Sequence, residues 1–123
     1  MKVFAAPPGA GKTFRLIEES ASTRLTIVCQ NRQLADRIMR MAREMNKSIP
    51  HPITFGDFIN GGPVWRDING FLIDDLDQFL RIFSRGVNVY AISLTSSQTY
   101  VPTHNDITET PLSRFPHWAG DSR

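Results

Sequence analysis

The feature that most constrains the fold of this chain is the segment Ala6-Pro-Pro-Gly-Ala-Gly11-Lys12-Thr13. It follows an apolar run from Lys2 to Ala6, which predicts a short strand, and it precedes a predicted helix from Thr13 to Ser20. The order of strand, glycine loop and helix fits the phosphate-binding pattern G-x-x-x-x-G-K-[ST], with Ala6 in place of the first glycine. The segment therefore predicts an α/β fold with an anion-binding loop after its first strand.

The residue types of this loop have a defined chemistry. Backbone N–H groups in such a loop point at phosphate oxygens, and the following helix offers its positive N-terminus. Lys12 would neutralise the outer phosphates, and the Thr13 hydroxyl would bind Mg²⁺. The alternative is a Gly-Pro turn with a surface lysine. The predicted nucleotide-binding residues are Ala6, Pro7, Pro8, Gly9, Ala10, Gly11, Lys12, Thr13 and Phe14.

The second half of such a site is predicted at Phe71-Leu-Ile-Asp74-Asp75, an apolar strand that ends in two acids. Mg²⁺ needs a carboxylate near the outer phosphates, and Asp74 is the predicted ligand, through a water molecule. Asp75 stands where a base would align the attacking water. For either acid the alternative is the cap of the helix that follows.

Strands and helices alternate along the rest of the chain, which predicts a mainly parallel sheet of four or five strands covered on both faces. The strand of Val3 is expected beside that of Val89, with the strand of Phe71 next. Leu34, Ile38 and Met41, with Met45, define the predicted core face of the second helix. The expected strands are Leu25–Cys29, Ile49–Thr54 (a short edge strand), Gly70–Asp74 and Asn88–Leu94, and the expected helices are 31–45, 55–60 and 76–85.

Length and composition fit one globular domain, because 123 residues with 41% hydrophobic and 21% charged residues can bury a single core. The one cysteine, Cys29, predicts no internal disulfide, and no zinc-ligand spacing is present. The chain carries neither a secretion signal nor an apolar run long enough to cross a bilayer. We expect a cytoplasmic protein with no membrane partner, a core at residues 1–98, and an irregular tail at 99–123 that is docked or binds a partner.

Together these motifs resemble the first RecA-like domain of superfamily 1 helicases, within the additional-strand catalytic-acid class of P-loop NTPases. Besides the loop, Asp74-Asp75-Leu-Asp-Gln78 is similar to the D-E-x-x-Q motif of that family. Ile53-Thr54-Phe55-Gly-Asp-Phe58 is similar to its T-F-x-x-F element, and Thr26-Ile-Val-Cys-Gln-Asn31 to the motif after its first helix. Ala91–Gln98 corresponds to a strand ending in G-D-x-x-Q, of which only the glutamine is present.

The resemblance implies a three-layer P-loop NTPase fold that binds ATP, or another nucleoside triphosphate, with Mg²⁺. Lys12, Asp75 and Gln98 would be the catalytic residues, with Gln98 as γ-phosphate sensor and Thr95 or Ser96 as substitutes for the missing pair. Gln78 would lie near the attacking water or link the site to the sensor, and the alternative is a glutamine on the helix surface. No glutamine that reads the base precedes the loop, so the base preference is open.

A helicase also needs a second RecA-like domain that donates an arginine, and this chain has none. The resemblance therefore implies slow hydrolysis by a freestanding domain, an accessory in DNA transactions of a kind familiar in phage genomes. Another copy or another protein would complete the site, with Arg81, Arg85 and Arg114 as candidate donors. Alternatives are a non-enzymatic protein-interaction module on the same fold and, with little room for its inserts, a nucleoside kinase.

Two features suggest a partner surface. Thr54, Phe55 and Phe58 would help to form a surface for single-stranded DNA in the family, although filling the core is the simpler interpretation. Four arginines on the helix after the second strand span a sector of about 140° opposite its apolar face. This face could follow phosphates, or it could be an ordinary solvated face. The four arginines are Arg32, Arg37, Arg40 and Arg43.

Overall fold

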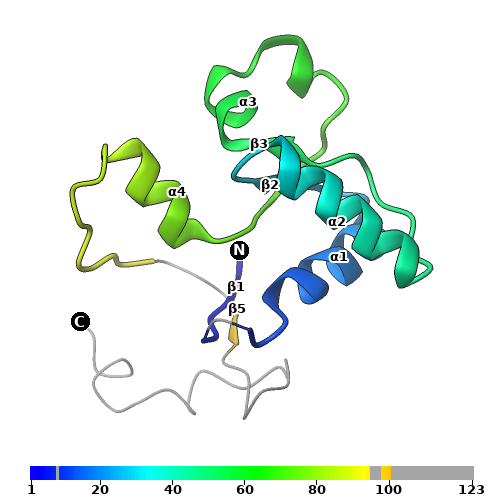
Figure 1. Ribbon diagram of the computed structural model, residues 1–123, viewed down its shortest axis with the longest axis horizontal. Coiled ribbons are helices and arrows are strands. Elements are labelled where there is room, and N and C mark those ends of the chain that lie inside the picture. Colours follow the sequence, from blue (N-terminus) through cyan, green and yellow to red (C-terminus); the bar gives the residue numbers. More distant parts are fainter. Residues whose placement is uncertain (8, 95–97, 101–123) are drawn as a thin grey trace. The chain divides into compact units, whose positions relative to one another are not determined.

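The computed structural model describes residues 1–7, 9–94 and 98–100, which form two compact units. Unit 1 comprises Met1–Lys12 and the chain from Ile92 onward, and unit 2 comprises Thr13–Ala91 (Figure 1). No helix in the described ranges is long and apolar enough to span a membrane. The elements are β1 (Lys2–Phe4), α1 (Lys12–Thr23), β2 (Thr26–Cys29), α2 (Arg32–Glu44), β3 (Ile53–Thr54), α3 (Phe55–Asn60), the 3-10 turn η1 (Gly62–Trp65), β4 (Phe71–Ile73), α4 (Leu76–Phe83) and β5 (Gln98–Tyr100).

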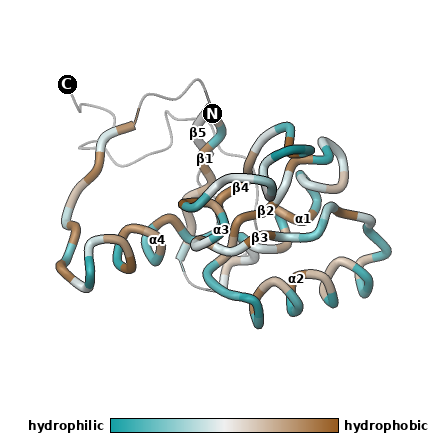
Figure 2. The backbone as a smooth tube through the Cα atoms, turned by 90° about the horizontal axis from the view of Figure 1, so that it is seen from above, coloured by the Kyte–Doolittle hydropathy of each residue, from teal (hydrophilic) through white to brown (hydrophobic). Residues whose placement is uncertain are grey.

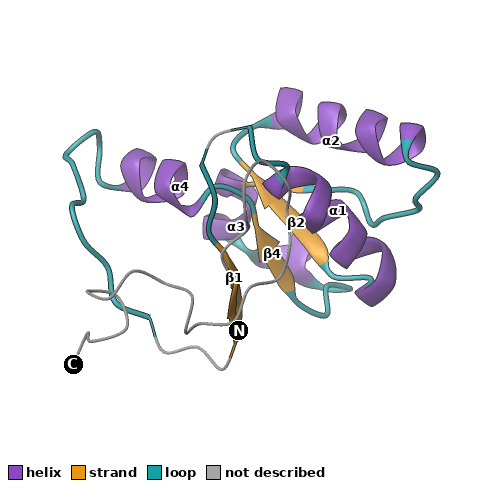
Figure 3. Ribbon diagram, turned by 90° about the horizontal axis from the view of Figure 1, so that it is seen from below, coloured by secondary structure: helices purple, strands orange, loops and turns teal. Residues whose placement is uncertain are grey.

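Unit 2 is a mixed α/β structure built on a parallel sheet with the strand order β3-β2-β4 (Figure 3). All four residues of β2 are buried, because the strand lies at the centre of the sheet and is covered on both faces. This burial explains the continuous apolar run that the sequence shows there. The short β3 forms one edge of this sheet, as the two prolines and the histidine just before it predict.

Helix α2 packs on β2 and β3. Asn31 caps it, as predicted, with its side-chain oxygen accepting a hydrogen bond from the Leu34 N–H at 2.9 Å. The predicted core face is only partly right. Ile38 is buried, but the other buried positions are Ala35 and Ala42, and the predicted residues Leu34, Met41 and Met45 are half-buried. Small side chains face the sheet because they let the helix approach it closely.

Helices α3 and α4 meet through aromatic rings. A capping box between Thr54 and Asp57 starts α3. The Phe79 ring of α4 lies 5.0 Å from that of Phe55 and 5.7 Å from that of Phe58. No residue of α4 is buried, and Figure 2 shows the helix extending away from the three-stranded sheet. These ring contacts join α4 to α3.

Unit 1 holds a parallel pair of strands, β1 and β5, in which Lys2 lies opposite Gln98 and Phe4 opposite Tyr100. Among the described residues, a sheet of three strands and a pair of two strands are found where a single sheet of four or five was expected. Strand β5 also crosses the expected boundary at residue 98, and the rest of the predicted tail lies outside the described residues.

The predicted strand Asn88–Leu94 is wrong, because these residues form neither strand nor helix. The strand that pairs with β1, which contains Val3, is β5 and not the predicted strand Asn88–Leu94. The side chains of Val89, Tyr90 and Ile92 are 48%, 90% and 53% exposed. β-propensity expresses how well a side chain fits a pleated, half-buried surface, and here no sheet supplies that surface.

Candidate functional site

The segment predicted as a phosphate-binding loop contains two glycines with left-handed backbone. Gly9 and Gly11 both have positive φ, of 79° and 83°, a region that side chains with a Cβ rarely adopt. The Ala10 N–H donates to the Pro7 carbonyl oxygen at 3.2 Å, which closes a turn. The Lys12 ammonium donates to the Ala6 carbonyl oxygen at 2.8 Å, so the lysine side chain reaches back across the loop. Pro8 lies outside the described residues.

Within unit 2, two predicted Mg²⁺ ligands that are 61 residues apart in sequence come together. The Thr13 hydroxyl, in the first turn of α1, donates to Asp74 Oδ2 at 3.3 Å. Asp74 follows β4 directly, and its N–H donates to the Val28 carbonyl oxygen at 2.9 Å, so the end of β4 is fixed to β2. A hydroxyl and a carboxylate are hard oxygen ligands of the kind that Mg²⁺ prefers.

Asp75 caps α4. Its Oδ1 accepts a hydrogen bond from the Gln78 N–H at 3.3 Å, and its backbone is left-handed, with φ 59° and ψ 69°. An aspartate tolerates this conformation better than most residues, but the position remains a local strain. The structure thus gives Asp75 the capping role that the sequence left as an alternative, and this role occupies one carboxylate oxygen.

Cys29 lies at the carboxyl end of β2, close to the acids that follow β3 and β4. Its Sγ is 3.6 Å from the carbonyl oxygens of Asn31 and Ile53. Burial, followed by the negative charges of Asp74 and Asp57, raises the pKa of the Cys29 thiol to about 11. The thiol is therefore neutral at physiological pH.

The other predicted site residues are more dispersed. Phe14 follows Thr13 on α1, and its ring is 48% exposed. Gln78 lies in the first turn of α4 and donates its N–H to Asp75. Gln98 begins β5 opposite Lys2, at the end of β1 away from the loop, whereas we expected it at the end of a strand. Its role as sensor stays a prediction; Thr95 and Ser96 lie outside the described residues.

The T-F-x-x-F element is structural in this chain. Phe55 is only 2% exposed and packs against Phe79. Thr54 is held in the capping box with Asp57, and Phe58 is half-buried between Phe71 and Phe79. Because a buried ring cannot stack on a base, the core interpretation holds for Phe55.

No group of three or more His, Cys, Asp and Glu side chains forms a metal cage among the described residues. Two of the three histidines and Arg114 fall outside those residues. The proximity of Cys29 to Asp57 and Asp74 was not predicted from the sequence. It could have been found by applying to β2, β3 and β4 together the rule that the carboxyl ends of parallel strands share one edge.

Comparisons with known proteins add no assignment, since no family model matches the chain and no curated protein or solved structure matches it significantly.

Proposed function

We propose that this chain binds a nucleoside triphosphate together with Mg²⁺ and hydrolyses it slowly. The observation that carries the proposal is the hydrogen bond between Thr13 and Asp74, which brings together the two oxygen ligands that the motifs predict. The loop supports it independently, because two glycines with positive φ surround a turn beside Lys12. A chance Gly-Pro turn would explain the loop alone but would not explain a carboxylate at the Thr13 hydroxyl.

The proposed roles follow from the chemistry of each group. The loop N–H groups and the Lys12 ammonium would bind the phosphate oxygens, and on binding Lys12 would exchange the Ala6 carbonyl for a phosphate oxygen. Thr13 and Asp74 would hold Mg²⁺, which would supply positive charge to neutralise the phosphate groups. We also propose that the chain has a three-layer P-loop NTPase fold of the RecA-like type. A role in DNA transactions is part of the same proposal.

Slow turnover follows from Asp75. A base must lie within hydrogen-bond reach of the attacking water, whereas one Asp75 oxygen accepts the Gln78 N–H. Asp75 can act as base only with its second oxygen or after it releases the helix cap. Both routes reduce the fraction of molecules that are ready to react.

Nucleotide binding is tested by thermal unfolding with ATP and Mg²⁺, each alone and together. A ligand at 100 times its Kd stabilises the native state by about 2.7 kcal/mol, so the melting temperature should rise by several degrees. The rise should appear only when ATP and Mg²⁺ are both present. Lys12→Ala should abolish the rise, and Asp74→Asn should reduce it, because Mg²⁺-dependent binding is weakened. Lys47→Ala and Asp77→Asn, at exposed positions, are the matched controls. An unchanged rise in Lys12→Ala would contradict the assignment of the loop.

Hydrolysis is tested by comparing two substitutions of Asp75. Asparagine still accepts the Gln78 N–H, so Asp75→Asn should keep nucleotide binding and stability within about 0.5 kcal/mol while phosphate release stops. Asp75→Ala should stop phosphate release and also cost about 1 kcal/mol through loss of the cap. Phosphate release by Asp75→Asn at the wild-type rate would rule out a catalytic role for this residue.

One observation favours the second candidate function, a protein-interaction module on the same fold. Large apolar side chains are exposed on and after α4, including Phe83 at 42%, Val87 at 69% and Tyr90 at 90%. Exposed apolar groups gathered in one segment are typical of a surface that binds another protein. Stabilisation by Mg²⁺ and ATP without any phosphate release would favour this alternative.

A further inference from the structure

The charges of the chain are separated along its sequence. Between Arg24 and Lys47 there are six basic residues and two acidic ones, whereas between Asp57 and Asp77 there are five acidic residues and one basic. The formal net charge of the whole chain is only +2, so the basic segment does not reflect a generally basic protein. A local excess of this kind is a candidate electrostatic footprint for a polyanion.

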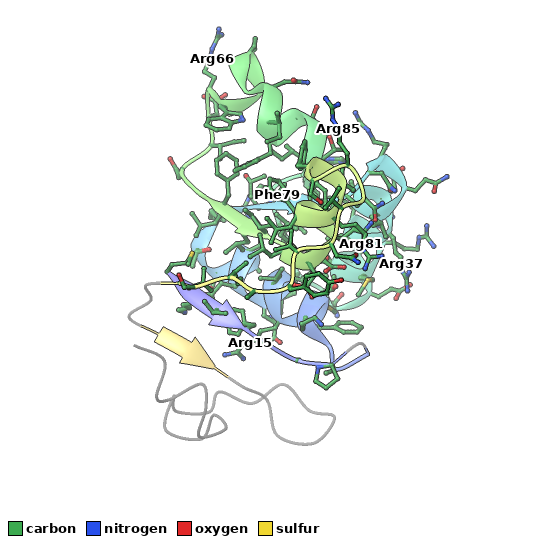
Figure 4. All side chains as sticks on the ribbon, turned by 90° about the vertical axis from the view of Figure 1, so that its left-hand side faces the viewer. Arg15, Arg37, Arg66, Phe79, Arg81 and Arg85 are labelled. Carbon is green, nitrogen blue, oxygen red and sulfur yellow. The ribbon has the colours of Figure 1, made fainter. Side chains whose placement is uncertain are left out.

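Helix α2 presents most of this charge on one outer face. Arg32, Arg37, Arg40 and Arg43 are all exposed, whereas Ala35, Ile38 and Ala42, on the opposite side, are buried. At 1.5 Å rise per residue, Arg32 and Arg43 are about 16 Å apart along the helix axis. Figure 4 shows the Arg37 side chain directed outward from the ribbon. We name the face formed by these four arginines the α2 arginine face.

The structure extends the α2 arginine face beyond the helix. The Arg24 guanidinium, at the end of α1, donates to the Ser48 carbonyl oxygen at 2.8 Å, so Arg24 lies beside the chain that leaves α2. Lys47 is exposed in the same stretch. Arg24, which follows α1, and Lys47, which follows α2, thus add two exposed basic groups near the C-terminal end of α2.

Within the described ranges 1–7, 9–94 and 98–100, the arginines of α2 form no ion pairs. Asp36 and Glu44 each stand four residues from Arg40, a spacing that permits a pair on a helix. Neither acid forms a salt bridge with an arginine of α2 in the part of the chain that the structure describes. No described acid therefore occupies the guanidinium groups of these arginines, which leaves them to an external anion. The planar guanidinium group suits phosphate oxygens in particular.

We propose that the α2 arginine face, extended by Arg24 and Lys47, binds the sugar-phosphate backbone of duplex DNA. A series of arginines along a rigid helix matches a repeating anion better than a single small one. The choice of a duplex follows from the composition of the surface. Proteins that bind single strands combine basic grooves with aromatic side chains on which bases stack, and no aromatic residue occurs between Arg24 and Pro50. A surface that contacts phosphates alone favours the polymer with the higher charge density, which is the duplex.

This proposal does not depend on nucleotide binding, so its test uses the full-length chain without nucleotide. Binding of a labelled duplex of about 20 base pairs is followed by fluorescence anisotropy, beside one of its single strands, from about 20 to 200 mM salt. The duplex should bind more tightly than the single strand, and its affinity should fall steeply as the salt concentration rises. At physiological salt its Kd should be on the order of 10⁻⁵ M, typical of contacts to phosphates without base recognition.

The decisive comparison uses two triple variants with the same change in net charge. Arg37→Gln, Arg40→Gln and Arg43→Gln together should weaken duplex binding at least about 10-fold at low salt and reduce the slope of log affinity against log salt by about 2 to 3. The control variant carries Arg66→Gln, Arg81→Gln and Arg85→Gln, at three exposed positions outside the α2 arginine face, labelled in Figure 4. It should bind within about twofold of the wild type. Circular dichroism melts check that both variants fold.

Three outcomes would overturn the proposal. Equal losses in the two triple variants would mean that overall charge, and not the α2 arginine face, determines binding. Tighter binding of the single strand than of the duplex would contradict the phosphate-only contact. Binding to vesicles that contain anionic lipid, with no binding to the duplex at 20 mM salt, would identify a membrane surface as the partner instead.

Discussion

At the scale of single residues, the side chains at the carboxyl ends of the strands of unit 2 have different interactions. Asp74 accepts the Thr13 hydroxyl, Asp75 caps a helix, and Cys29 is buried beside the charge of Asp74. Adjacent acids have different roles because one follows the end of the strand and the other begins the helix. The pKa of the neighbouring Cys29 thiol reflects this environment, since burial and negative charge both disfavour the thiolate.

The raised pKa of Cys29 predicts a loss of stability at alkaline pH. The unfolded thiol loses its proton near pH 9, whereas the folded thiol keeps its proton up to about pH 11. Because the unfolded state then binds fewer protons, the free energy of unfolding falls as the pH rises between these values. At pH 10.5 the loss should be about 2 kcal/mol greater in the wild type than in Cys29→Ala.

This difference is measured by urea unfolding of both proteins at pH 8 and pH 10.5. Lysines and tyrosines titrate equally in the two proteins, so their contributions cancel. Identical pH dependence in the two proteins would show that the thiol is not held neutral by the fold.

At the scale of elements, hydrophobic spacing identified helix α2 but not all of the residues that it buries. The large side chains of α2 mark its apolar side, yet the positions in closest contact are Ala35 and Ala42, each 1% exposed. Apolar spacing defines a direction on the helix, and the distance to the sheet then decides which side chains fit there. Small residues are favoured where the helix and the strands approach most closely.

Substitution of Ala42 tests this close approach. Ala42→Leu inserts a side chain where α2 meets β2 and β3, and overpacking of this kind should reduce the free energy of unfolding by about 1 to 3 kcal/mol. Met41→Leu, which conserves volume at a half-buried neighbour, is the matched control and should cost less than about 1 kcal/mol. Urea unfolding measures both. A larger loss in the Met41 variant would restore the face predicted from sequence.

At the scale of the whole molecule, the chain consists of two units, and the first helix begins at their boundary. Unit 2 has a continuous parallel sheet, whereas the segment from Ser84 to Leu94 forms neither helix nor strand. A segment without sheet partners and with exposed side chains opens at low free energy, while a buried strand opens only with the fold. Susceptibility to proteolysis should therefore differ sharply along the chain.

Limited digestion with trypsin tests this difference. Among the basic residues from Thr13 to Leu94, Arg85 should be cleaved first, because it is exposed and begins the stretch after α4. N-terminal sequencing should then detect a new terminus at Gly86, and Arg85→Gln should remove that product. Cleavage within α2 before Arg85 would contradict this order, since α2 is held by the sheet.

The sequence by itself determined most of the local elements and the position of the loop between a strand and a helix. Strand, loop and helix at the N-terminus, the Asn31 cap and the edge position of β3 follow from propensity, capping and proline placement, which act over a few residues. The encounter of Thr13 with Asp74 was also predictable, because the end of a parallel strand and the start of a helix share one edge of the sheet.

Only the tertiary structure decided which strands pair. The run from Asn88 to Leu94 has strong β-propensity, but β1 pairs with Gln98–Tyr100 instead. Propensity is a property of a segment, whereas a strand also needs a neighbour with free backbone groups at the right distance. The same dependence on neighbours buried Phe55 and assigned the closest contacts of α2 to alanines, because both outcomes depend on residues far away in sequence.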